Sequence, residues 1–210
     1  MKKLVLLIVV LVSVIPAKAD IFSDDFNIGV AGYVIPNNPP DNLNRAPVNW
    51  DIWGTPGKSW SMQSNRGDAG LNAIVISQWG ADTGITTKLS YDVSGMSSLN
   101  ISVETMSEGW GWHLTGLVGG IFKDAGGVPL STVLTSLTDP NVYIEPGWVW
   151  VTRNASVAVP TGAASVQFQI VNPYMPGQTN GAIWFDNFVA TPEPMTVCLL
   201  GLGALLIRRK

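Results

Sequence analysis

The chain has 210 residues, of which 46% are hydrophobic and only 13% are charged, about half the usual charged share of a globular protein. Charge is unevenly distributed: residues 20 to 191 contain 14 acidic and 6 basic residues, a net charge of −8, and the remaining basic residues lie at the two ends. An acidic domain of this kind repels phosphate backbones, which excludes nucleic acid as a partner. It is better suited to a polar uncharged ligand or to a divalent cation.

Residues 1–19 have the pattern of a secretory signal peptide. A basic start at Lys2 and Lys3 precedes a twelve-residue apolar run, and Pro16 ends that run. Ala17 and Ala19 supply the small residues expected at a signal cleavage site. The apolar run is shorter than the roughly 20 residues of a membrane anchor, so the sequence predicts export and a mature chain that begins at Asp20.

Residues 20–190 are predicted to form one all-β domain, because period-2 alternation recurs there and no helical period is sustained. Residues 28–70 are predicted to be long, packed surface loops. A hairpin turn is predicted at residues 124–127 (Asp-Ala-Gly-Gly). The expected strands are Ala73–Gln78, Leu89–Val93, Ile101–Glu104, Leu114–Phe122, Trp148–Thr152, Val166–Ile170 and Ala182–Ala190. Many short strands separated by Gly, Pro and Asn predict an antiparallel β-sandwich.

The C-terminal segment, residues 191–210, combines three signals in order. These are the triplet Pro192, Glu193 and Pro194, the apolar run Met195–Ile207, and the basic end Arg208, Arg209 and Lys210. Thirteen apolar residues barely span a bilayer, while the basic end would remain in the cytoplasm during translocation. The pattern predicts transient membrane insertion, and an ordinary short tail anchor is the alternative.

This tail resembles the PEP-CTERM sorting signal of Gram-negative bacteria. The Pro-Glu-Pro triplet, the Leu-Leu-Gly-Leu-Gly stretch at 199–203 and the terminal arginine pair match in order and spacing. The resemblance implies processing near the triplet by an exosortase, a membrane protease-transpeptidase. It also implies a destination in the cell envelope, at the cell surface or in an exopolysaccharide matrix.

The domain is similar in layout to the jelly-roll carbohydrate-binding modules. An acidic opening at residues 23–27 (Ser-Asp-Asp-Phe-Asn) begins the first strand, and residues 183–188 (Ile-Trp-Phe-Asp-Asn-Phe) close the last one. Residues 159–163 (Val-Pro-Thr-Gly-Ala) lead into the alternating strand between them. The resemblance implies a jelly-roll-like sandwich.

All nine tryptophans lie within the domain, and tryptophan is a natural platform for sugar rings. Trp110 and Trp112, separated by one glycine, would share a strand face about 7 Å apart. The predicted loops add Trp50, Trp53 and Trp60 as candidate ligand-binding residues. The alternative is a structural role, since tryptophan is usually well buried, and this is expected for Trp148, Trp150 and Trp184.

Asp24, Asp25 and Asp186 are candidate ligands of a structural calcium. In the modules that the domain resembles, the first and last strands are neighbours and calcium often lies beside them, and calcium takes several hard oxygens. The only cysteine, Cys198, lies in the tail, so no intrachain disulfide reinforces the domain and a metal could. Solvated or turn-capping aspartates are the alternative.

Catalysis is not favoured by the residues present. His113 is the only histidine, and Glu104 and Glu108 would lie about 13 Å apart along a strand, too far for paired glycosidase carboxylates. The sequence therefore predicts non-catalytic glycan binding by an exported protein. A structural matrix protein without a specific ligand is the alternative, ahead of a polysaccharide-active enzyme.

Overall fold

The structure is a computed structural model that describes residues 20–26, 48–53, 60–63, 73–77, 82–107, 116–137, 147–173 and 182–193. Every regular element within these ranges is a β-strand, and all strand pairs are antiparallel. None of the described residues forms a helix long and apolar enough to cross a membrane.

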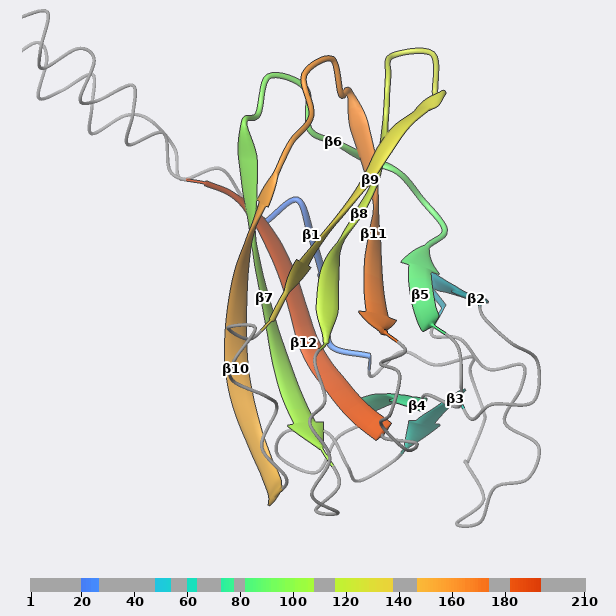
Figure 1. Cartoon of the computed structure of the whole chain (residues 1–210), viewed down its shortest axis with the longest axis vertical. Coiled ribbons are helices and arrows are strands. Elements are labelled where there is room, and N and C mark those ends of the chain that lie inside the picture. The colour runs from blue at the N-terminus through green and yellow to red at the C-terminus, as the bar shows by residue number, and fades with distance from the viewer. Residues whose placement is uncertain are drawn as a thin grey trace, which may run out of the picture.

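One sheet of six strands, called sheet A, has β12 (Ala182–Pro192) near its centre. Its order is β10-β7-β12-β4-β3, formed by β10 (Gly147–Ala158), β7 (Ser98–Ser107), β12, β4 (Ala73–Ser77) and β3 (Trp60–Gln63). β1 (Phe22–Asp24) pairs with the second half of β12, so the first and last strands are neighbours. Figure 1 shows β10, β7 and β12 side by side as one curved layer.

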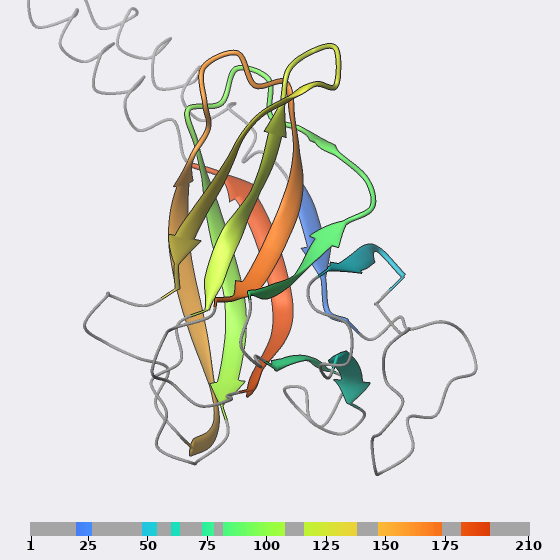
Figure 2. The ribbon, with the colours of Figure 1, turned by 45° about the vertical axis from the view of Figure 1, so that its right-hand side comes forward.

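The second six-stranded sheet, sheet B, faces the first. Its order is β2-β5-β11-β8-β9, formed by β2 (Trp50–Trp53), β5 (Thr83–Thr87), β11 (Ser165–Asn172), β8 (Leu117–Lys123) and β9 (Pro129–Ser136), with β6 (Tyr91–Asp92) also on β11. In the turned view, β8, β9 and β11 lie in front of the strands of sheet A (Figure 2). The predicted all-β, antiparallel, jelly-roll-like sandwich is confirmed.

The core lies between the sheets and is supplied by alternate residues of each strand. Val166, Phe168 and Ile170 of β11 are fully buried, and the inward residues of β7 face them from the other sheet. An aromatic cluster fills the core beside β1. Phe22 stacks on Phe168 with ring centroids 5.9 Å apart, and Trp50 meets Phe188 edge-on at 5.5 Å.

Two sequence predictions are corrected by the strands. The region predicted as loops, residues 28–70, contains β2 and β3, which the pairing with β5 and β4 makes regular. The alternation predicted at 89–93 is wrong at its start, because Leu89 is 67% exposed and the strand is only Tyr91–Asp92. The Thr87 hydroxyl donates to the Leu89 carbonyl and bends the chain there, after the end of β5.

Candidate functional site

The short strand β2 places its two tryptophans on opposite faces of sheet B. Trp50 points inward, is 0% exposed and contacts Phe22, Phe26 and Phe188. The prediction of Trp50 as a ligand-binding residue is therefore wrong, because no face of its ring is free. Trp53, three residues further along an alternating strand, lies on the outer face.

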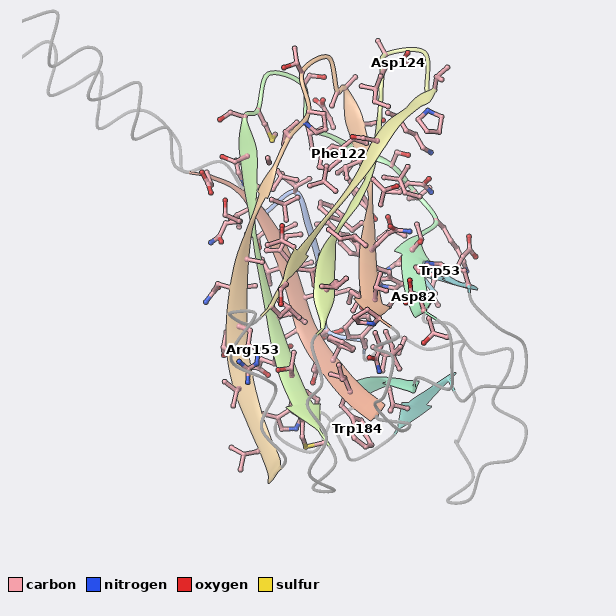
Figure 3. All side chains as sticks on the ribbon, in the orientation of Figure 1. Trp53, Asp82, Phe122, Asp124, Arg153 and Trp184 are labelled. Carbon is pink, nitrogen blue, oxygen red and sulfur yellow. The ribbon has the colours of Figure 1, made fainter. Side chains whose placement is uncertain are left out.

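The indole of Trp53 is held against the backbone of β5. Trp53 pairs with Gly84, and a Cβ atom placed on Gly84 would lie 2.2 Å from Cζ2 of Trp53, so only glycine lets the ring settle there. The Nε1–H of Trp53 donates to the Thr86 hydroxyl at 2.9 Å. The ring is fixed by contact and by a hydrogen bond together. Figure 3 labels Trp53 near β2 and β5.

Polar side chains of three strands surround this ring. Gln169 of β11 donates its Nε2–H to the same Thr86 hydroxyl at 2.9 Å, which couples β11 to Trp53 through one oxygen. Asp51 is exposed on β2, opposite Thr86 in the ladder, and Asp82 is exposed two residues before Gly84. We call the set Asp51, Trp53, Asp82, Thr86 and Gln169 the Trp53 face. Chemically, it offers a preorganised aromatic surface bordered by hydrogen-bond acceptors.

Sequence reasoning found only Trp53 of these five residues. Thr86 and Gln169 carry no motif, and they join the site because the β5–β11 ladder places them opposite each other. The sequence Trp-Asp-Ile-Trp at 50–53 could have indicated this arrangement. In a strand, the two tryptophans face opposite ways, and Asp51 lies on the same face as Trp53.

The outer face of sheet A carries a different cluster, which is already buried. Met106 and Trp184 are 4% and 2% exposed, and they cluster with Ala73 and Val75 while half-buried Trp150 packs against them. Trp184 is thus buried as expected, but in a small second hydrophobic cluster that is separate from the main core. Because its side chain is buried, the Trp184 ring cannot stack on a sugar as an exposed ring could.

A polar group borders this second cluster at a bulge in β12. Asp186 lies opposite Glu104 in the ladder, and the register shifts between Asp186 and Val189. Asn187, with φ of 48°, donates its amide Nδ2–H to Glu104 at 2.9 Å, and its backbone N–H goes to Asp186 at 2.8 Å. Asn187 at the bulge is therefore hydrogen-bonded both to Asp186 of its own strand and to Glu104 of β7.

The three predicted calcium ligands do not converge. The carboxylate of Asp24 accepts hydrogen bonds from the Phe26 N–H, the Asn49 side-chain amide and the Trp50 Nε1–H, at 2.8, 2.9 and 3.0 Å. Within the described ranges no three His, Cys, Asp or Glu side chains are grouped so that they could hold a metal ion. Asp24, Asp25 and Asp186 thus belong to no such group in the described part of the chain, and the Asp24 carboxylate accepts hydrogen bonds from protein N–H groups.

Several predicted site residues fall outside the described part of the chain. These are Trp110, Trp112, Glu108, Ala17, Ala19, Pro194, Arg208 and Arg209. Trp60 begins β3, where it pairs with Ile76. Pro192 and Glu193 of the triplet are described, at the end of β12.

No protein-family model matches this sequence, and no curated protein matches it. Among solved structures, the chain is similar to the CBM22-1 xylan-binding domain of Paenibacillus barcinonensis Xyn10C, with a TM-score of 0.53 and 12% identity. That match covers 84% of this chain and 96% of the other. It is also similar to the CBM22-1–GH10 modules of Clostridium thermocellum xylanase 10B, crystallised with xylohexaose, with a TM-score of 0.50 and 14% identity.

The match to the xylanase covers 83% of this chain but 29% of that one. The enzymatically active domain of bacteriophage CBA120 tailspike protein 4 matches over 69% of this chain and 19% of its own length, with a TM-score of 0.49 and 16% identity. The likeness to the two xylan-related structures, at 12% and 14% identity, establishes the fold alone. The structures similar in fold include carbohydrate-binding modules.

Proposed function

We propose that this protein is a non-catalytic glycan-binding domain and that the Trp53 face of sheet B is its binding surface. The observation that carries the proposal is the fixed indole of Trp53, seated on Gly84 and hydrogen-bonded to Thr86. A ring that is already held in place loses little conformational entropy when a ligand stacks on it. The fold shared with xylan-binding modules supports the proposal.

The chemistry of the face suits a sugar ring. The C–H face of a pyranose stacks on an aromatic ring, and its hydroxyls then need acceptors and donors at the rim. Asp51 and Asp82, both exposed, are strong acceptors for such hydroxyls.

The preferred glycan is uncharged. Lys88, the residue directly after β5, lies four residues from Gly84, about 13 Å along an extended chain. Its ammonium group donates to the Val48 carbonyl at 2.9 Å. The exposed carboxylates of Asp51 and Asp82 would repel a uronate-rich polymer and would accept hydrogen bonds from the hydroxyls of a neutral one.

Trp50 and Trp53 provide a matched pair of substitutions on one strand. Trp53→Ala is expected to weaken binding to the best ligand of a glycan array by about tenfold, since an aromatic contact of this kind contributes about 1–2 kcal/mol. Trp50→Ala is expected to cost about 3–5 kcal/mol of unfolding free energy, because it empties the core. Array binding and thermal melts of the purified chain measure both.

The proposal fails if the array gives a ligand whose binding Trp53→Ala leaves unchanged. If the folded protein binds no glycan at all, the structural matrix role takes its place. Binding accompanied by cleavage of the polysaccharide would favour the enzyme alternative instead.

We also propose that the chain is exported and sorted to the cell envelope or extracellular matrix. The signal-peptide pattern at residues 1–19 and the resemblance of residues 191–210 to the PEP-CTERM signal support this route. Mass spectrometry of protein from the native host should find a chain that starts at Asp20 and lacks Arg208–Lys210. An intact C-terminus in surface fractions would instead indicate a permanent anchor.

A further inference from the structure

The last described residues are integrated into sheet A beyond the point where the domain was expected to end. Thr191 and Pro192 pair with Asn100 and Leu99 of β7, and the Glu193 N–H donates to the Ser98 carbonyl at 3.4 Å. The ladder thus continues through Glu193 rather than stopping at residue 190. Two residues of the Pro-Glu-Pro triplet belong to the folded domain.

The side chain of Glu193 extends this connection across a third strand. One carboxylate oxygen accepts a hydrogen bond from the Ser98 hydroxyl of β7, and the other accepts one from the Ser156 hydroxyl of β10. These two bonds hold the pKa of Glu193 below its ordinary value. We call Glu193, Ser98 and Ser156 the Glu193 clasp.

The opposite edge of β12 is occupied in the three residues just before this part. β1 pairs with Phe188, Val189 and Ala190, and the Ile21 N–H donates to the Ala190 carbonyl at 2.8 Å. Enzymes and receptors that take extended peptides use these same backbone groups of the peptide to form a strand with it. Residues 188–190, paired on both edges, become available to them only after local opening of the sheet, and residues 191–193 must first release their β7 side if an enzyme uses those groups.

We infer that the Glu193 clasp sets the boundary at which the C-terminal segment can be removed from the folded protein. An enzyme that hydrolyses the chain here adds water across a peptide bond, and the ladder with β7 and the clasp hold the chain through Glu193 against it. A partner that recognises the Glu193 carboxylate must compete with the Ser98 and Ser156 hydroxyls. This inference is independent of glycan binding and rests on the ladder and on three side chains.

Limited digestion of the full chain with proteinase K tests the clasp. The mass of the surviving domain should give a C-terminus at or after Glu193 in the wild type and in Ser97→Ala, an exposed neighbour outside the clasp. Ser98→Ala combined with Ser156→Ala should lose Glu193 at least about tenfold faster, because both carboxylate bonds are gone. Threonine at both positions, which keeps the hydroxyls, should restore protection.

A wild-type domain that is trimmed to a residue before Glu193 overturns the inference. It is also overturned if the double alanine variant retains Glu193 as long as the wild type does. Thermal melts check that the variants fold, and Glu193→Ala, which leaves both strands unaltered, must reproduce the faster trimming by exposing Pro192 and Thr191.

Discussion

Asp24 shows how one carboxylate can organise the opening of the domain. It receives three N–H donors, and one of them is the Nε1–H of the fully buried Trp50. The positive φ of Phe26, 51°, is compatible with this turn because the Asp24 carboxylate captures the Phe26 N–H. The sequence signal that suggested a calcium ligand is therefore the signature of a hydrogen-bonded turn.

Asp24→Asn keeps the shape of this side chain but replaces an acceptor oxygen with an NH₂ group that faces other donors. We expect the free energy of unfolding to fall by about 2 kcal/mol, the cost of leaving buried donors without acceptors. Urea denaturation measures it, with Asp20→Asn, an exposed carboxylate at the start of the domain, as control. Equal stability of Asp24→Asn and the wild type would refute this role of Asp24.

Glu193 gives the protein a predictable response to acid. Its folded-state pKa is lowered, so its stabilising effect is present above the ordinary value of 4.5 and is lost as pH falls through the lowered pKa. The difference in melting temperature between wild type and Glu193→Gln should therefore be largest near neutral pH and shrink below about pH 4. A difference that stays constant between pH 7 and pH 3 would contradict the assignment.

At the scale of elements, the hairpin of β8 and β9 depends on one close approach. A Cβ atom on Gly119 would lie 1.9 Å from the Val133 carbonyl oxygen on β9. Gly119→Ala must push the two strands apart, and we expect a loss of about 2–4 kcal/mol in unfolding free energy. Gly126→Ala in the same hairpin, where the nearest atom is the Asp124 carboxylate at 3.3 Å, should cost clearly less. Similar costs for both would show that β9 adapts freely.

The elements that sequence reasoning predicted are those with a clear chemical pattern. β4, β7, β11 and β12 alternate or run apolar, and the turn at residues 124–127 forms because Asp124 accepts the N–H groups of Gly126 and Val128, both at 2.9 Å. β5 was missed because its sequence, Thr-Gly-Ile-Thr-Thr, has one large apolar residue and is nevertheless buried throughout. Its burial follows from its place between β2 and β11 in sheet B and from the Trp53 ring over Gly84.

The candidate site could be foreseen only in part for the same reason. Tryptophan content predicted aromatic platforms, but whether a ring faces the core or solvent depends on strand register. Trp50 and Trp53 are three residues apart and therefore face opposite ways, which requires knowing that 50–53 is a strand. The partners Thr86 and Gln169 come from segments more than 30 residues away, joined by pairing that local pattern does not encode.

At the scale of the whole molecule, the sandwich separates two outer faces with different properties. On sheet A, the apolar cluster around Trp184 is buried and the end of β12 is held by the Glu193 clasp. On sheet B, Trp53 is half-buried, Asp51 of the same strand is exposed, and so is Asp82, which is labelled near Trp53 in Figure 3. The domain thus has one sheet that carries the first and last described strands, β1 and β12, and another whose outer face carries the Trp53 face proposed to bind a glycan.

The most direct measurement of this division is an amide and indole NMR spectrum of the ¹⁵N-labelled protein, titrated with the neutral glycan that binds best on the array. If the glycan binds at the Trp53 face, the Trp53 Nε1–H signal should shift together with the backbone signals of Asp51, Thr86 and Gln169. All four shifts should saturate at one affinity. Signals of β7, β10 and the Glu193 clasp should stay in place. Shifts confined to sheet A, with Trp53 unaffected, would contradict the central claim that the Trp53 face binds the glycan.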